Sequence, residues 1–292
     1  MDWNFVLVLA IGILATLSLN IGKAVQKMKV FVLKKGKDMI GPEYRKDFGV
    51  WCIGISMTIV ASVLFIVAQK MTDKTSIVAS LNGVGLVGLA IFSYFVLKEK
   101  VGKREWGAIA LIVVGTAIVS YFNVDSSEEK KVFIGNLWWC SGIATFGFAV
   151  LLFILSRVKK GQAFVYAAIA GTCLGIMQIF YHVGPIVTGD NSMVTQFGTV
   201  YPWAGIMIGN MAFVFTQFAF FHGSGIYVVP TVNSFMIIVP MIVEIFVFGT
   251  VLAPVQYAGA AVIIVGVILL TSGGGHIVED GSGQAPSEAK KE

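Results

Sequence analysis

Nine runs of about 20 apolar residues constrain this chain more than any other feature of its sequence. A run of that length crosses the hydrocarbon layer as an α-helix, which satisfies its backbone polar groups internally. With 57% hydrophobic and 13% charged residues, the chain has too little polar surface for a water-soluble fold. The sequence therefore predicts an all-α, polytopic membrane protein. The predicted spans are residues 3–22, 49–69, 76–97, 105–122, 133–155, 163–187, 202–221, 227–248 and 254–272.

The basic residues predict the orientation of these spans. All 21 Lys and Arg residues fall outside them, and 17 lie in the C-terminal tail or in loops that follow odd-numbered spans. Because Lys and Arg are enriched in cytoplasmic loops, this side is predicted to be cytoplasmic. The N-terminus is then outside, the C-terminus is inside, and the plasma membrane is the expected location.

An internal repeat relates two parts of the chain. Shifting the sequence by 151 residues aligns "SIVASLN" (76–82) with "YVVPTVN" (227–233), and "LIVVG" (111–115) with "VIIVG" (262–266). The first copy begins in the third span and the second in the eighth. An odd number of crossings separates them, so the copies are predicted to run through the bilayer in opposite directions. This inverted-topology arrangement is typical of secondary transporters.

The two copies also resemble the drug/metabolite transporter superfamily, often called EamA-like. The resemblance rests on "SIVASLNGVGLVGLAIFSYFVLKEKVGKREWGAIALIVVGTAIV" and on "YVVPTVNSFMIIVPMIVEIFVFGTVLAPVQYAGAAVIIVGVILL". Glu99 matches the loop acid of that superfamily, whereas Thr250 stands at its place in the second copy. Nine spans rather than ten, with "SLNIGKAVQK" and "DFGVWCIGIS", are similar to the NIPA branch. The resemblance implies a transporter fold and, for that branch, magnesium transport.

The repeat predicts a division into four and five helices. Residues 1–122 form the first membrane repeat, which contains a basic cytoplasmic loop at 23–48, and residues 133–272 form the second. Within the loop, "VFVL" beside lysines is expected to form a short helix at the lipid surface. Residues 273–292 are polar and glycine-rich, and are predicted to be a disordered cytoplasmic tail.

Polar residues within the spans are the candidate substrate pathway, because each is unfavourable in lipid unless it meets a partner or water. Glu244 is the acid well inside a span, and it either faces a cavity or reaches the outer headgroups. Asn82 and Asn233 occupy equivalent places in the two copies, and they either line the pathway or hydrogen-bond a neighbouring helix. If the substrate is Mg²⁺, these three residues are its candidate ligands.

Two further polar pairs have helical spacing. Asn210 and Gln217 are seven residues apart and Gln178 and His182 four apart, so each pair is expected to share a helix face and line the pathway. For His182, packing or an interfacial place is the alternative to metal ligation. Asn20, near the cytoplasmic end of the first span, is a further lining or gate candidate.

The function that these features favour is secondary transport by alternating access, with a small metabolite or Mg²⁺ as substrate. A lipid-carrier flippase and a non-transporting scaffold subunit are the alternatives. The sequence carries no phosphate-binding loop and no pattern that indicates an enzyme or a cofactor. The net charge of +5 comes mainly from cytoplasmic loops, so it indicates topology rather than nucleic-acid binding. Lipid is an expected partner, and a homodimer or a membrane complex is left open.

Overall fold

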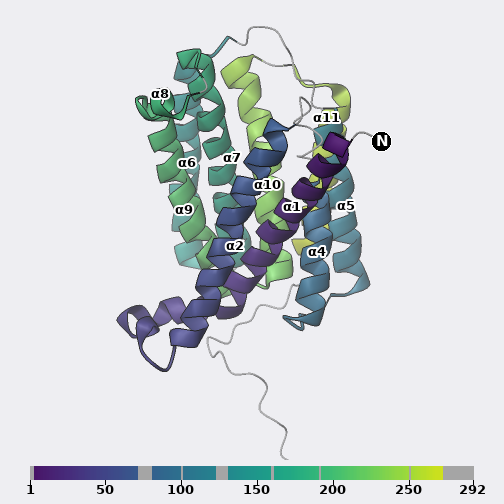
Figure 1. The fold of residues 1–292 in the computed structure, drawn as a ribbon, viewed down its shortest axis with the longest axis vertical. Helices are drawn as coiled ribbons and strands as arrows, with labels where there is room; N and C mark the ends of the chain where they lie inside the picture. The colour runs from purple at the N-terminus through teal and green to yellow at the C-terminus, as the bar shows by residue number, and fades with distance from the viewer. Residues whose placement is uncertain are drawn as a thin grey trace, which may run out of the picture.

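The computed structural model describes residues 3–71, 81–99, 101–122, 131–158, 161–190, 192–249 and 251–271, and these form helices and connecting turns. The helices are α1 (Trp3–Lys29), η1 (Val30–Ile40), α2 (Arg45–Lys70), α4 (Asn82–Phe95), α5 (Lys103–Tyr121), α6 (Ile134–Val158), α7 (Gln162–Thr188), α8 (Met193–Phe197), α9 (Val200–His222), α10 (Gly225–Phe248) and α11 (Pro254–Thr271). Figure 1 shows the long helices side by side in one bundle.

Eight of these helices are long and apolar enough to cross a membrane. A shorter apolar helix, Gly83–Phe95, covers the described part of the predicted third span. The all-α expectation is therefore confirmed, and each predicted span coincides with a helix. The five-residue helix α8, in the connection between α7 and α9, was not predicted.

The first span is longer than predicted. Helix α1 continues past residue 22 to Lys29, and η1 follows it with a break in the helical backbone at Gly36. The expectation that every Lys and Arg lies outside the spans is wrong, because Lys23 is buried inside α1. The run of apolar residues stops at Lys23, but lysine is a good helix former, so the helix continues through it.

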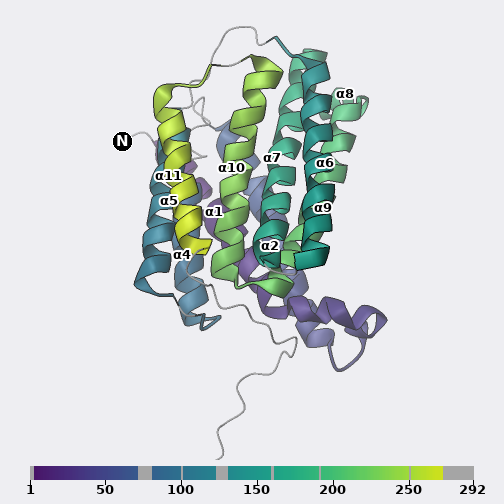
Figure 2. The same cartoon turned by 180° about the vertical axis from the view of Figure 1, so that it is seen from behind.

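Helix α10 lies at the centre of the bundle. It contacts α1, α4, α5, α6, α7, α9 and α11. Figure 2 shows it between the α5–α11 pair on one side and α6, α7 and α9 on the other. A residue on almost any face of α10 therefore meets another helix, which explains why its side chains from Val228 to Ser234 are all buried.

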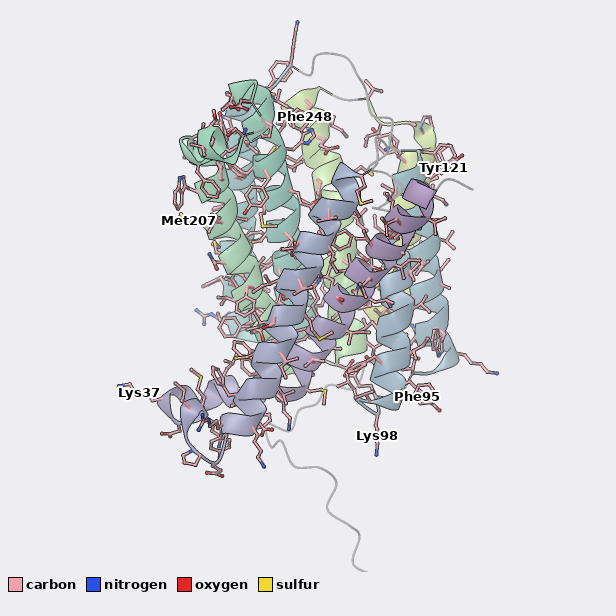
Figure 3. The ribbon with its side chains drawn as sticks, in the orientation of Figure 1. Lys37, Phe95, Lys98, Tyr121, Met207 and Phe248 are labelled. Atoms are coloured by element: carbon pink, nitrogen blue, oxygen red, sulfur yellow. The ribbon has the colours of Figure 1, made fainter. Side chains whose placement is uncertain are left out.

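Helices α4 and α10 run in opposite directions. Figure 3 labels Phe95, the last residue of α4, at the lower end of the bundle and Phe248, the last residue of α10, at the upper end. The lower end also carries Lys98 and the basic η1 segment with Lys37, and we call it the basic end. The upper end, with Tyr121 and Phe248, is called the N-terminal end because α1 begins there.

Glycines bring α5 and α11 into backbone contact. A Cβ atom on Gly115 would lie 2.7 Å from the carbonyl oxygen of Gly259, and one on Gly266 would lie 2.9 Å from the carbonyl oxygen of Ala108. Shifting Gly115 and Ala108 by 151 residues gives Gly266 and Gly259. The two contacts are thus equivalent under the sequence repeat, and in each of them one copy contributes the glycine and the other copy contributes the carbonyl.

Candidate transport site

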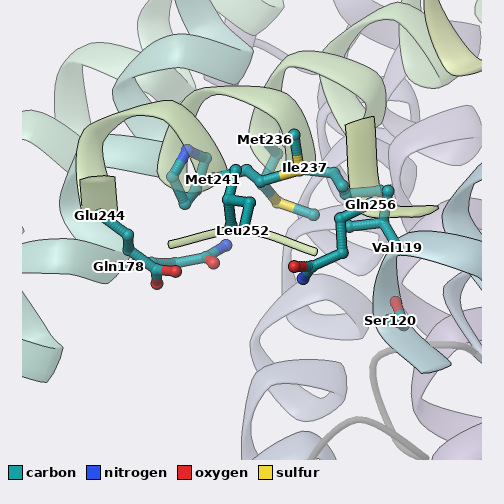
Figure 4. Close-up of a pocket in the computed structure, with 10 residues that line it drawn as sticks. Val119, Ser120, Gln178, Met236, Ile237, Met241, Glu244, Leu252 and Gln256 are labelled. Atoms are coloured by element: carbon teal, nitrogen blue, oxygen red, sulfur yellow. The ribbon is translucent and has the colours of Figure 1, made fainter. Parts of the chain in front are cut away.

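An open pocket of about 180 Å³ lies toward the N-terminal end of the bundle (Figure 4). Helices α5, α7, α10 and α11 and the segment before α11 form its wall. The lining residues are Val119, Ser120, Gln178, Met236, Ile237, Pro240, Met241, Glu244, Leu252 and Gln256. Its wall is mostly apolar, with a few polar side chains, as is typical of small-molecule sites.

Three long polar side chains reach into this pocket. Figure 4 shows Gln178 and Glu244 next to each other on one side and Gln256 on the other. Gln256 is buried, and its Oε1 accepts a hydrogen bond from the backbone N–H of Ala253 at 2.9 Å, which holds the side chain at the start of α11. The wall of the pocket therefore carries one carboxylate and two carboxamides.

A buried polar chain links α1 to α10 deeper in the bundle. Lys23 Nζ donates to Asn233 Oδ1 at 3.0 Å, and Asn233 Nδ2 donates to Asn20 Oδ1 at 2.8 Å. Asn20 Nδ2 in turn donates to the backbone oxygen of Thr16 at 2.9 Å. Both polar atoms of the Asn233 side chain are thus occupied, and the amide orients the lysine.

A second buried set joins α1, α2 and α9. Gln217 Nε2 donates to Gln26 Oε1 at 2.9 Å, and Trp51 Nε1 donates to Gln217 Oε1 at 3.2 Å. Gln26 Nε2 donates to the backbone oxygen of Gly54 at 3.2 Å, where the backbones of α1 and α2 approach closely. Gln217 therefore acts in helix packing here, and it does not line the pocket.

Charged side chains connect helix ends at the basic end of the bundle. Glu99 accepts hydrogen bonds from the first two N–H groups of α10, from Gly225 at 2.8 Å and from Ile226 at 3.1 Å. Lys27 of α1 donates to the backbone oxygen of Phe220, near the end of α9. These contacts tie α1, α9, α10 and the segment after α4 together, and we call Glu99, Lys27 and the α10 N-terminus the basic-end closure.

Replacing Glu99 by alanine is expected to lower the free energy of unfolding by about 1–2 kcal/mol. The change removes a capping acceptor and a negative charge from the N-terminus of α10. Thermal unfolding of the purified protein in detergent measures it. Glu43→Ala, at an exposed position, is the control, and equal melting temperatures for the two variants would contradict the capping role.

The predicted site residues do not form one cluster. Gln178 and Glu244 line the pocket, whereas Asn20 and Asn233 belong to the buried chain. Eleven residues of helix, or about 16 Å, separate Asn233 from Glu244, so one Mg²⁺ ion cannot bind both. The side chain of Asn82 lies outside the described residues, as does Thr250.

The polar pairs expected on α7 and α9 do not both face the pathway. Asn210 is exposed and donates to the backbone oxygen of Ile206 in its own helix, whereas Gln217 is buried. His182 is exposed, and its ring lies edge-on to that of Phe248 with 5.3 Å between centroids. Among the residues that the structure describes, no three of His, Cys, Asp and Glu gather as metal ligands.

Sequence reasoning missed Lys23, Gln26 and Gln256. The first two follow Thr16 and Asn20 at helical spacing, so one face of α1 carries polar groups at 16, 20, 23 and 26–27. That pattern was present in the sequence, but it crosses the predicted end of the first span. Gln256 stands two residues after Pro254, the first residue of α11, and had no comparable signal.

Comparisons with known proteins point to membrane transporters. The chain is 24% identical over 275 residues to a protein named Probable magnesium transporter NIPA9 from Arabidopsis thaliana, a match that covers 89% of this chain and 78% of that protein. It is 23% identical over 158 residues to the UDP-galactose/UDP-N-acetylglucosamine transporter srf-3 of Caenorhabditis elegans, covering 53% of this chain and 42% of that protein. No family model and no solved structure matches. The chain is an integral membrane protein that is similar to transporters of more than one kind of solute.

Proposed function

We propose that the chain is a secondary transporter that moves a small solute by alternating access. The observation that carries this proposal is the order in which the pocket, Asn233 and the basic-end closure follow one another along α10. The open pocket ends at Met236 and Ile237, Asn233 lies one turn deeper, and the basic-end closure holds Gly225 at the start of the helix. One state of such a transporter has a site near one side of the membrane and interhelical contacts near the other, and the pocket toward the N-terminal end with the hydrogen bonds at the basic end is compatible with such a state.

Two observations support the inverted repeats, residues 1–122 and 133–272, on which this mechanism depends. Helices α4 and α10, which carry the aligned residues Asn82 and Asn233, run in opposite directions (Figure 3). The α5–α11 contacts at Gly115 and Gly266 exchange places under the 151-residue shift. Together these features favour an approximate twofold relation between the halves, about which they can rock.

The charges favour a cytoplasmic basic end. The segment from Lys23 to Lys46, which includes η1, carries eight basic residues at that end, and cytoplasmic loops are enriched in Lys and Arg. In this orientation, in the plasma membrane, the N-terminus and the pocket face outward. The transporter would then be open to the outside and closed toward the cytoplasm.

Between the two substrates that the sequence left open, the charge pattern favours a metabolite over Mg²⁺. Lys23 occupies the Asn233 oxygen that a metal would need. Two like unit charges 4 Å apart repel by roughly 4 kcal/mol at an effective dielectric constant of 20, and a divalent ion doubles this. Magnesium remains the alternative substrate at the pocket itself, where Glu244, Gln178 and retained waters provide oxygen ligands.

Solute uptake by purified protein in liposomes tests the proposal. A panel of anionic and neutral metabolites and Mg²⁺ is compared, with and without a proton gradient. Replacing Glu244 by glutamine is expected to lower the uptake of the transported solute by roughly tenfold or more, because a charged hydrogen-bonding group leaves the pocket wall.

Asn210→Leu is the matched control for this test, because Asn210 is an exposed amide on α9 that bonds only its own helix in the described structure. It is expected to transport like the wild type. Undiminished uptake in Glu244→Gln would reject the role of the pocket. Absence of uptake for every solute, together with movement of labelled lipid between leaflets, would favour a lipid flippase.

A further inference from the structure

The most unusual charged group in the bundle is Lys23. It is 7% exposed, and it lies on α1 about 9 Å along the helix before the end at Lys29. Among the residues that the structure describes, Lys23 bonds the Asn233 amide rather than a carboxylate, whereas the nearby Lys29 forms an ion pair with Asp47. A lysine buried in a membrane bundle without a counter-charge is unfavourable, and such residues generally serve function.

The hydrogen bonds of Lys23 leave it able to bind more. An ammonium group has three N–H donors and no acceptor, and within the described structure one of the donors is used, toward Asn233 Oδ1. The amide of Asn233 is fixed in turn by Asn20, so it orients the ammonium without neutralising it. Lys23 therefore lacks a negative charge and hydrogen-bond acceptors beside it, and an oxyanion would supply both.

Lys23 does not line the pocket, but its partner Asn233 lies one helical turn from residues that do. Its partner Asn233 is followed at three and four residues by Met236 and Ile237, which line the inner end of the pocket. Residues with this spacing lie on the same helix face one turn apart, about 5 Å along the axis. On the other side, Lys27 lies one turn beyond Lys23 in the basic-end closure. Lys23 is thus placed between the pocket and the closed end.

From these observations we propose that Lys23, oriented by Asn233 and Asn20, binds the acidic group, a carboxylate or phosphate, of the transported solute. The inference rests on the proposed transport function and names its substrate class as anionic metabolites. The solute enters at the pocket, where Glu244 accepts hydrogen bonds from its donor groups, and its acidic group binds Lys23 beside Asn233, about 16 Å along α10 from Glu244 and so away from that carboxylate. The ammonium gains a counter-charge there while it keeps or exchanges its bond to Asn233.

Ligand binding and uptake test this inference separately. Inorganic phosphate, succinate, glucose and MgCl₂ are tested as probes that raise the melting temperature of the purified protein, and labelled phosphate and succinate are tested for uptake into liposomes. We expect stabilisation by at least one of the two anions, and we expect Lys23→Met to weaken that anion's binding roughly 10- to 100-fold through loss of a charged hydrogen bond. Lys37→Met, at an exposed lysine, is expected to bind like the wild type.

Asn233→Asp provides a second variant that does not depend on removing the lysine. It places a carboxylate beside Lys23, so the protein should stay folded through an internal ion pair while the anion loses its binding partner. Anion binding that is equal in wild type, Lys23→Met and Asn233→Asp, or stabilisation by glucose or MgCl₂ alone, would overturn the inference.

Different results would reject the anion site at Lys23 and the transport function. Saturable uptake of glucose or Mg²⁺ that persists in Lys23→Met would keep the transporter and reject the anion site. Anion binding that depends on Lys23, without uptake of any solute, would keep the site and reject the transporter.

Discussion

Replacing Asn233 by leucine is expected to lower the free energy of unfolding by about 3–5 kcal/mol. The substitution leaves the buried Lys23 ammonium without its hydrogen-bond acceptor. It also removes the Asn233 N–H group that donates a hydrogen bond to Asn20 Oδ1. Denaturation of the purified protein in detergent measures the change. Asn210→Leu makes the same exchange at an exposed position of α9, and it should change stability by less than about 0.5 kcal/mol.

The double variant Lys23→Met/Asn233→Leu shows whether the buried charge causes the loss. Replacing both partners by apolar groups removes the need to solvate the ammonium, so most of the stability should return. A residual loss of about 1–3 kcal/mol is expected from the unpaired Asn20 oxygen. A double variant that is as unstable as, or less stable than, Asn233→Leu would show that Asn233 stabilises the bundle by packing instead.

The membrane helices could be predicted because each carries its signal locally. A helix in lipid must be apolar over about 20 residues, so the runs around α6, α7, α9, α10 and α11 were visible without any knowledge of their neighbours. The failure at α1 has the same origin. A count of apolar residues stops at Lys23, although the helix continues and tertiary contacts with Asn233 accommodate the charge.

The partners of the polar residues could not be predicted in the same way. Asn20 and Asn233 were both candidates, but they stand 213 positions apart, and only the packing of α1 against α10 brings their amides together. Asn210 and Gln217 have the spacing of residues on one helix face, but their surroundings differ. Asn210 is exposed, whereas Gln217 hydrogen-bonds Gln26 and Trp51. Helical spacing identifies a face, whereas the neighbouring helix decides what that face does.

The close approach of α7 to α10 leads to a second large effect. Gly171 of α7 lies against α10, where an added Cβ would meet the backbone oxygen of Val232 and come within 2.6 Å of Phe235 Cβ. Gly171→Val is expected to destabilise the protein by about 1–3 kcal/mol, since two helix backbones would have to separate. It should also lower uptake, because the segment of α10 that moves holds Asn233 and leads to Met236 in the pocket wall.

Gly147→Val on α6 is the matched control for that substitution. An added Cβ at Gly147 meets nothing within 4 Å, so the same change of helix propensity occurs there without the clash. The difference in melting temperature and in uptake between the two variants therefore measures the α7–α10 contact alone. Equal stability and equal uptake would mean that α10 is not held against α7 at Gly171. The position of the pocket and of Asn233 would then not depend on the central packing of α10, and the route from the pocket to Lys23 would lose its structural basis.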